Sequence, residues 1–129
     1  MHSREAEVDT MNILKEIPVK SLGVAHSFTS SFKMARKLVE MGWYIGINGI
    51  VTFKNAEDLR AVVKWLPIDK ILLETDSPFL APVPFRGKPN SPIHIPTIAM
   101  FIAELKNVSI HDLAKQTNEN AQRLFNLPN

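Results

Sequence analysis

The sequence predicts an α/β fold made of parallel βαβ units, of the kind that builds a (β/α)8 barrel. Two observations predict this fold class: three short, continuously apolar segments, and amphipathic helical segments that alternate with them. Strands covered on both faces have unbroken apolar runs, and alternation with helices makes such strands parallel. A closed barrel needs eight units and about 250 residues. We therefore expect a single partial domain over residues 1–129, with about three strands, flanking helices and a barrel that is not closed within the chain.

The first third of the chain predicts a helix, a strand and a second helix. Apolar residues recur at near-helical spacing from Arg4 to Ile17, which predicts an amphipathic helix. A short apolar run at 21–25 predicts a strand, and the hydroxyl-rich stretch 27–31 after it offers N-cap residues. The second helix is expected from about Phe32 to Met41, with Gly42 at its C′ position.

The middle of the chain predicts two more strands around another helix. The aromatic and β-branched run Trp43–Ile47 is bounded by turn residues, which favours a buried strand. Asn55 can cap the helix that follows and ends before Pro67. Its apolar face consists of Leu59, Val62, Val63 and Leu66. The third strand is expected at Ile71–Leu73.

A proline-rich loop and C-terminal helices complete the predicted elements. Residues 78–96 hold most of the nine prolines, which predicts an ordered irregular loop with Gly87 as its pivot. Pro96 suits the first turn of the next helix. That helix has an apolar face made of Ile95, Ile98, Ile102 and Leu105. Ser109 and Asn118 are expected to cap two shorter helices.

Composition narrows the chemistry more than it indicates partners. Apolar residues make up 45% and charged residues 22%, as in globular domains, and 15 Lys and Arg against 13 Asp and Glu give no strong field toward nucleic acid. The absence of cysteine excludes disulfides and thiolate metal sites, so His, Asp and Glu remain as metal ligands. With no targeting signal and no membrane span in the sequence, we expect a cytoplasmic protein without a membrane partner.

Metal-competent residues follow two of the three predicted strands. His26 and Asp76 come directly after strands, at the end of a parallel sheet where working groups gather. His2 occupies the position of a third ligand if a strand precedes it. Imidazole and carboxylate suit Zn²⁺, Mn²⁺ or Mg²⁺, which can lower the pKa of bound water. The alternatives are a structural histidine and an ordinary Asp-Ser-Pro turn.

Several other polar residues are weaker candidates for a functional role, and each also has a structural explanation. Glu74 either holds a metal ligand in place or pairs with a nearby Arg, and Arg4 has the same ambiguity. His94 and His111 are expected to face solvent or to cap helices. Three residues of the proline-rich loop either meet a phosphate or are solvated: Arg86, Lys88 and Asn90.

Five motifs in this order closely resemble the TatD family of metal-dependent deoxyribonucleases and related phosphoester hydrolases, which are amidohydrolase-like barrels. The motifs are His2-Ser3-Arg4-Glu5-Ala6, Gly23-Val24-Ala25-His26-Ser27-Phe28-Thr29, Asn48-Gly49-Ile50-Val51-Thr52-Phe53-Lys54-Asn55, Leu73-Glu74-Thr75-Asp76-Ser77-Pro78-Phe79-Leu80-Ala81-Pro82 and Glu119-Asn120-Ala121. The resemblance covers essentially the whole chain. One departure is His94, near which family members commonly have Tyr.

The resemblance implies divalent-metal ligands at His2, His26 and Asp76, with Asp76 also helping to activate water as a catalytic residue. The family's opening His-x-His pair and its bridging mid-chain Glu have no counterpart here. By this resemblance the chain corresponds to the C-terminal half of the barrel, beginning at the end of the fifth strand. The implied substrate is DNA or another phosphoester.

Half a barrel leaves an open sheet edge and an incomplete ligand set, so we expect little or no hydrolase activity from the isolated chain. A separate N-terminal half chain could complete the barrel, or two copies could self-associate through their open edges. The alternative is a catalytically silent fragment or interaction module. A further alternative, a nucleic-acid binder using Arg86 and Lys88, would show salt-dependent DNA binding without cleavage.

Overall fold

Three short parallel strands form the sheet in the computed structural model, which describes residues 1–18 and 21–128. They are β1 (Val24–Ala25), β2 (Tyr44–Ile47) and β3 (Ile71–Leu73), in that spatial order. β1 pairs with β2 and β2 with β3, both in parallel. His2 forms an isolated parallel bridge with His26, so the start of the chain extends the sheet beside β1.

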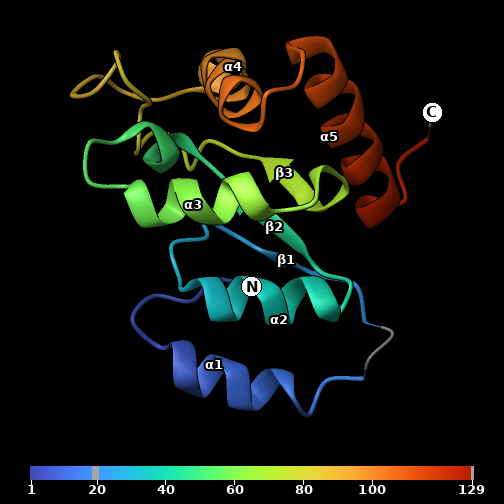
Figure 1. Cartoon of the computed structure of the whole chain (residues 1–129). Helices are drawn as coiled ribbons and strands as arrows, with labels where there is room; N and C mark the ends of the chain where they lie inside the picture. The colour runs from blue at the N-terminus through green and yellow to red at the C-terminus, as the bar shows by residue number, and fades with distance from the viewer. Residues whose placement is uncertain (19–20, 129) are drawn as a thin grey trace.

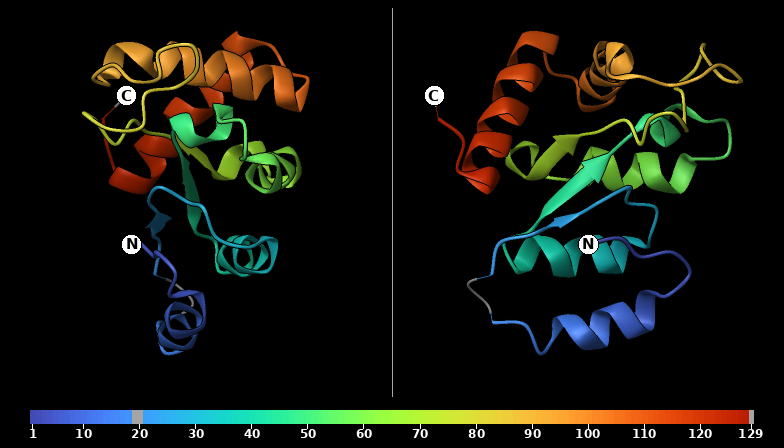
Figure 2. Two further views of the ribbon diagram at one scale, coloured as in Figure 1. Left: turned by 90° about the vertical axis from the view of Figure 1, so that its left-hand side faces the viewer. Right: turned by 180° about the vertical axis from the view of Figure 1, so that it is seen from behind.

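Among the described residues, five α-helices and three short 3-10 helices flank the sheet (Figure 1). The α-helices are α1 (Glu7–Leu14), α2 (Phe32–Glu40), α3 (Glu57–Trp65), α4 (Ile95–Lys106) and α5 (Ile110–Phe125). The 3-10 helices are η1 (Gly49–Thr52), η2 (Ile68–Lys70) and η3 (Pro92–His94). Seen from behind, the strands lie in front of α2 and α3, and no described helix crosses them in that view (Figure 2). The helices therefore cover one face of the sheet far more than the other.

The main core lies between the sheet and its helices. Side chains alternate along a strand, so one face of the sheet carries Ala25, Ile45, Ile47 and Ile71, and all four belong to the main hydrophobic cluster. The opposite face carries Val24, Tyr44, Gly46 and Leu72. Tyr44 and Leu72 are buried but stand outside that cluster. This second face is the one toward which a closed barrel would turn its interior.

The structure confirms the strand at 71–73 and finds the other two strands shorter than predicted. β2 begins at Tyr44 rather than at Trp43, and only Val24 and Ala25 of the run 21–25 pair with it. The backbone N–H of Ser21 donates instead to the Pro18 carbonyl. The neighbouring strand therefore sets the start of β1, because only paired residues form a strand.

Helices form in all the predicted regions, but two predicted caps and some predicted bounds are wrong. Ser31 caps α2, Gly42 has a φ of +83° after it, and Ser109 caps α5. The cap predicted at Asn55 is wrong, because α3 starts after Ala56 and has no side-chain cap. The negative charges of Glu57 and Asp58 in its first turn interact favourably with the helix dipole instead.

The two shorter C-terminal helices predicted after Ser109 are also wrong, because α5 runs unbroken from Ile110 to Phe125. Asn118 is an exposed residue in its middle. The buried face of α5 continues past it through Leu113, Thr117 and Asn120, so packing holds the helix where the local signal predicts a break.

Among the described residues, no single helix is long and apolar enough to span a membrane. The helical segments Pro92–Lys106 and Ile110–Phe125 reach the required length and apolar character only when taken together, and they are bent by 110° relative to each other.

The first helix is shorter than the apolar pattern predicts. α1 spans Glu7–Leu14 rather than 4–17, because Glu5 has a φ of +53° that no α-helix accommodates. At the other end, the N–H of Ile17 donates to the Leu14 carbonyl in a tighter turn. Leu14 is the buried residue of α1, so this helix adds little to the core.

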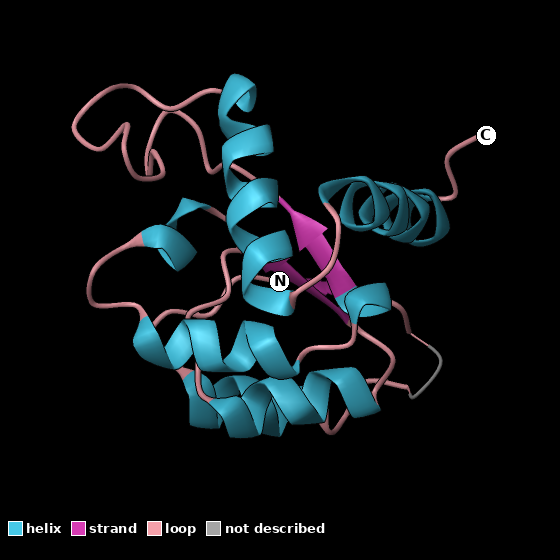
Figure 3. Cartoon of the chain, turned by 45° about the horizontal axis from the view of Figure 1, so that its top comes forward, coloured by secondary structure: helices cyan, strands magenta, loops and turns pink. Residues whose placement is uncertain are grey.

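The proline-rich segment is irregular over 78–91, as predicted, and leads to α4 (Figure 3). The predicted end of the loop at residue 96 is wrong, because η3 occupies 92–94 and α4 begins at Ile95. Gly87 has a φ of +82°, as its expected role as a pivot requires. Asn90 is buried, and its amide donates to the carbonyls of Thr75 and Phe79 at 2.9 and 2.8 Å. These bonds fasten the far end of the loop to the segment that follows β3.

Candidate metal centre

The ends of β1 and β3 bring two of the predicted metal ligands together. Parallel strands place their carboxyl ends at one edge of a sheet, and here His26 and Asp76 both stand at that edge. His26 Nε2 lies 3.3 Å from Asp76 Oδ1. Both side chains are partly exposed, at 42% and 37%, so a small ion or a water molecule can reach the pair. Residues separated by 50 positions thus form one polar site.

Glu74 contacts the other side of the same imidazole ring. Its Oε2 lies 2.8 Å from His26 Nδ1, and its Oε1 accepts the backbone N–H of Ser27. Of the two roles considered for Glu74, holding a candidate ligand is therefore the one the contacts support. Gly46 of β2 makes this position possible, because a Cβ atom there would lie 2.4 Å from Glu74 Oε2.

A buried polar network supports the backbone behind the site. Asn48, after β2, donates its side-chain N–H to Ser27 Oγ at 2.8 Å and accepts the N–H of Ile50 at 3.1 Å. Ser27 and Asp76 both adopt positive φ, at 50° and 58°. Left-handed backbone in a non-glycine residue costs on the order of 1 kcal/mol and persists where neighbouring contacts enforce it. The strand ends are thus held in a shape that aims their side chains at one another.

The sequence interpretation missed Ser27, Gly46 and Asn48 as parts of this site. The available signal was positional, since a polar residue directly follows the end of every strand. Gly46, the small residue within the second strand, also marks a close approach of another group. Neither signal reveals which partner is approached.

His2 reaches the same edge without joining the pair. Its ring centroid lies 5.8 Å from that of His26, with the two planes at 51°. The backbone N–H of His26 donates to the Met1 carbonyl at 2.7 Å, which fixes the neighbouring segment. In the part of the chain that the structure describes, no group of three or more His, Asp or Glu side chains is arranged to hold a metal ion.

The donor chemistry of the His26–Asp76 pair fits a divalent cation. A carboxylate only accepts hydrogen bonds, so Glu74 favours a hydrogen on His26 Nδ1, and a metal ion would then bind at Nε2. That lone pair faces a carboxylate oxygen, an arrangement that a cation between them stabilises. Two atoms each about 2.0–2.1 Å from a tetrahedral Zn²⁺ lie roughly 3.3 Å apart, which is the separation observed.

The weaker candidates lie elsewhere or have structural partners. The Arg86 guanidinium lies 3.8 Å from the centroid of the Phe53 ring, and the His94 ring stacks on Phe85 at 4.3 Å. His111 is 86% exposed in its side chain, as expected of a solvent-facing residue. Asn90 holds the loop through its internal hydrogen bonds, as described above. Lys88 is exposed.

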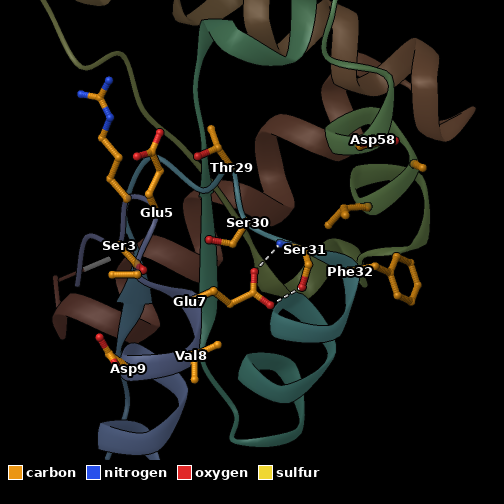
Figure 4. Close-up of a pocket in the computed structure, with 14 residues that line it drawn as sticks. Ser3, Glu5, Glu7, Val8, Asp9, Thr29, Ser30, Ser31, Phe32 and Asp58 are labelled. Carbon is orange, nitrogen blue, oxygen red and sulfur yellow. Dashed lines mark hydrogen bonds between the residues drawn. The ribbon is translucent and has the colours of Figure 1, made fainter.

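A cavity of about 940 Å³ opens between the N-terminal ends of α1 and α2 (Figure 4). Glu7 lies at its floor and accepts hydrogen bonds from the Ser31 N–H, at 2.9 Å, and from the Ser31 hydroxyl. Its charged lining comprises Arg4, Glu5, Glu7, Asp9 and Asp58. Four carboxylates and one guanidinium give this cavity a net negative charge, which repels a phosphate group. Neither His26 nor Asp76 lines the cavity. The carboxyl ends of the strands, where His26 and Asp76 meet, remain the candidate metal centre.

The sequence profile of the family described as TatD related DNase matches residues 1–126. The chain belongs to this family. The fold-class prediction is confirmed as well, because the three parallel strands and flanking helices superimpose on a TatD-family structure. That structure, the TatD homologue YjjV of Escherichia coli, gives a TM-score of 0.88 at 32% identity over 98% of this chain and 49% of that one.

Curated TatD-type relatives match along the same length. YcfH of Escherichia coli, named as an uncharacterized metal-dependent hydrolase, is 47% identical over 98% of this chain and 48% of its own length. YabD of Bacillus subtilis, named in the same way, is 45% identical over 98% of this chain and 50% of its own length. The chain thus spans about half the length of the curated relatives it matches.

Proposed function

We propose that this TatD-family chain contributes part of the active centre of a metal-dependent hydrolase that cleaves phosphoester bonds in DNA. The observation that carries the proposal is the meeting of His26 Nε2 and Asp76 Oδ1 at 3.3 Å, at the carboxyl edge of the sheet. Imidazole nitrogen and carboxylate oxygen are ligands of Zn²⁺, Mn²⁺ and Mg²⁺. The family profile and the names of the relatives support hydrolysis as the reaction.

Within this proposal each side chain has a separate task. His26 and Asp76 hold the divalent ion, and His2, on the segment beside β1, supplies a further nitrogen. A bound divalent ion lowers the pKa of water and stabilises charge on a phosphoryl oxygen. Asp76 would also orient the attacking water and accept its proton, because a carboxylate has two oxygens that can accept hydrogen bonds. The partial exposure of the pair makes it accessible to a substrate from solvent.

The proposal includes a partner that completes the ligand set. Across the described residues, β3 pairs with β2 alone, and the chain spans about half the length of its curated relatives. A second polypeptide carrying the other half of a barrel would pair with this edge and bring the missing ligands. A second copy of this chain is the other partner that could cover the edge.

Cleavage of DNA tests this function most directly. The chain is incubated with DNA and Mg²⁺, Mn²⁺ or Zn²⁺, alone and with the N-terminal half of YcfH. We expect little cleavage by the chain alone and metal-dependent cleavage by the mixture. Asp76→Asn should lower the rate on the order of 10²-fold or more, because it removes a ligand charge and a proton acceptor.

The matched control is Asp69→Asn, which changes an exposed aspartate in η2, just before the amino end of β3 and thus at the opposite end of that strand from Asp76. It should leave the rate within a factor of two of the parent. Cleavage that survives Asp76→Asn would overturn the assignment of the catalytic residue. A mixture that assembles and binds metal without cleaving DNA would remove DNA as the substrate.

A second candidate function is a catalytically silent fragment or interaction module. It is favoured by one observation, that no group of three ligands is assembled within the described residues. In that case neither the chain nor the mixture cleaves DNA, and the chain takes up no metal ion with the half of YcfH present.

A further inference from the structure

We propose that Glu74 is a positioning residue that fixes which nitrogen of His26 faces the metal position, and that Gly46 gives it the space to do so. This inference rests on the proposed function, because it concerns how a ligand of that centre is presented. It assigns a role to two residues that bind neither metal nor substrate.

Both carboxylate oxygens of Glu74 have fixed donors. Oε1 accepts the N–H of Ser27, and Oε2 lies 2.8 Å from His26 Nδ1. Ser27 is itself held by the Asn48 side chain at 2.8 Å. The Glu74 side chain is 18% exposed, so solvent competes little for these bonds. Glu74 is thus anchored through residues at the ends of all three strands.

The anchoring decides the proton arrangement of the imidazole ring. With Oε1 engaged by a backbone N–H, Oε2 remains as an acceptor and calls for hydrogen on His26 Nδ1. The lone pair then lies at Nε2, the atom 3.3 Å from Asp76 Oδ1. A histidine that carried its hydrogen on Nε2 could not bind a metal at that position. Outer partners of this kind typically change metal affinity by about 10–100-fold.

Gly46 is the structural condition for this arrangement. An added Cβ atom would lie 2.4 Å from Glu74 Oε2, 2.8 Å from its Cδ and 3.1 Å from the Ala25 carbonyl oxygen. Gly46 is in register with Leu72, on the same face of the sheet as Glu74. A side chain at position 46 would therefore move the carboxylate away from His26 or push β1 away from β2.

The replacement Glu74→Gln tests the inference, because it keeps the shape and removes one acceptor. The Ser27 N–H needs an oxygen, so the glutamine oxygen takes that place and its amide nitrogen faces His26 Nδ1. The ring must then accept at Nδ1 and carry its hydrogen on Nε2. Two-bond nitrogen–hydrogen NMR correlations of the metal-free chain, at about pH 9 where histidine is ordinarily neutral, distinguish these two forms.

We expect the Nδ1–H form in the parent chain and the Nε2–H form in Glu74→Gln. Gly46→Ala should also reduce the Nδ1–H form, by displacing the carboxylate. Glu104→Gln, at an exposed position of α4, is the matched control and should give the parent spectrum for His26. Backbone amide spectra of the same samples show whether each variant is folded.

A folded Glu74→Gln variant that keeps the Nδ1–H form would overturn the inference, since a residue that merely fills space is replaced by glutamine without effect on the ring. The measurement needs neither metal nor cleavage. Its failure would therefore leave the proposed hydrolase function standing. Conversely, the expected spectra combined with absence of cleavage would count against the hydrolase function alone.

Discussion

At the scale of single residues, buried asparagines hold the irregular parts of this chain. Asn48, Asn90 and Asn120 are each less than 5% exposed, and each amide nitrogen donates to a group in another segment. A buried amide without partners is costly, so such residues are placed only where acceptors are fixed. Two of the three lie at or near the strand ends that form the candidate site.

Asn120 carries a stability prediction at this scale. Its amide donates to the carbonyls of Ile68 and Ile71 at 2.9 and 2.8 Å, which ties α5 to β3. Asn120→Ala leaves both carbonyls without this donor and should lower the free energy of unfolding by about 2–3 kcal/mol. Urea denaturation followed by circular dichroism measures this change.

Asn118→Ala is the control for that measurement, because Asn118 is exposed on the same helix two residues away. It should change the free energy of unfolding by less than about 0.5 kcal/mol. Equal losses in the two variants would mean that the buried amide contributes no more than a surface one. The contacts of Asn120 thus give a structural role to the central residue of the Glu119-Asn120-Ala121 motif.

At the scale of elements, Lys106 joins the ends of two helices. It stands in the last turn of α4, and its Nζ donates to the carbonyls of Val63, Lys64 and Leu66 at 2.9, 3.2 and 2.6 Å. The last carbonyls of a helix have no partner within it, so Lys106 caps α3 from outside. The cationic group also interacts favourably with the negative end of that helix.

Lys106→Met should therefore loosen the packing of α4 on α3. The variant keeps the length of the side chain and removes the donor, and we expect the free energy of unfolding to fall by about 1–2 kcal/mol at neutral pH. Lys115→Met, at an exposed position of α5, is the control and should have little effect. Comparable destabilisation by both variants would show that loss of a positive charge, rather than loss of the cap, is responsible.

The contribution of Lys106 to the free energy of unfolding depends on pH with a defined sign. Burial lowers the pKa of Lys106 below its ordinary value of 10.5. As pH rises toward 10.5, the folded chain releases this proton before the unfolded chain does, so the unfolded chain binds more protons and stability increases with pH. The free energy of unfolding of the parent should accordingly rise relative to that of Lys106→Met on the alkaline side of neutrality. Urea titrations across that range measure the difference, and a difference that shrinks would contradict the prediction.

At the scale of the whole molecule, the sheet has a helix-covered face and an incompletely covered one. Its strand order ends at β3 on one side, and on the other only the single bridge of His2 lies beyond β1. Strand edges with unpaired backbone groups are templates for association with another chain. Among the described residues, the outer edge of β3 therefore has unpaired backbone groups that another chain can bind.

The corresponding prediction concerns stability rather than catalysis. Addition of the N-terminal half of YcfH should raise the melting temperature of this chain, because a partner that binds only the folded state stabilises it by mass action. Differential scanning fluorimetry measures the shift, and native mass spectrometry counts the chains in the complex. A half-barrel fragment from an unrelated protein is the control and should leave the melting temperature unchanged.

Two other outcomes of that experiment are informative. A homodimer that forms at rising concentration without the added half would show self-association through the open edge. No shift and no complex with either partner would contradict complementation. The second result would leave the silent module as the better account of this chain.

The predictions from sequence succeed where the signal is local. The strand at 71–73, the Ser31 and Ser109 caps and the pivot at Gly87 each depend on residues within a few positions. They fail at Asn55 and Asn118, where an equally local cap signal is overridden by the turn before α3 and by the continuous buried face of α5. Propensity is a weak preference that tertiary packing readily reverses.

The sequence by itself determined the parallel βαβ architecture, the family, and the carboxyl ends of the strands as the place of the candidate ligands. The reason is that apolar segments and the order of motifs are visible in the linear sequence. Only the tertiary structure decided that Glu74 contacts the His26 ring, 48 positions away in the sequence, and that the absence of a side chain at Gly46 leaves space for Glu74. It also decided that Arg86 stacks on Phe53 and that Asn90 fastens its own loop. The physical reason is that a partner is chosen by distance in space, and strand pairing sets that distance.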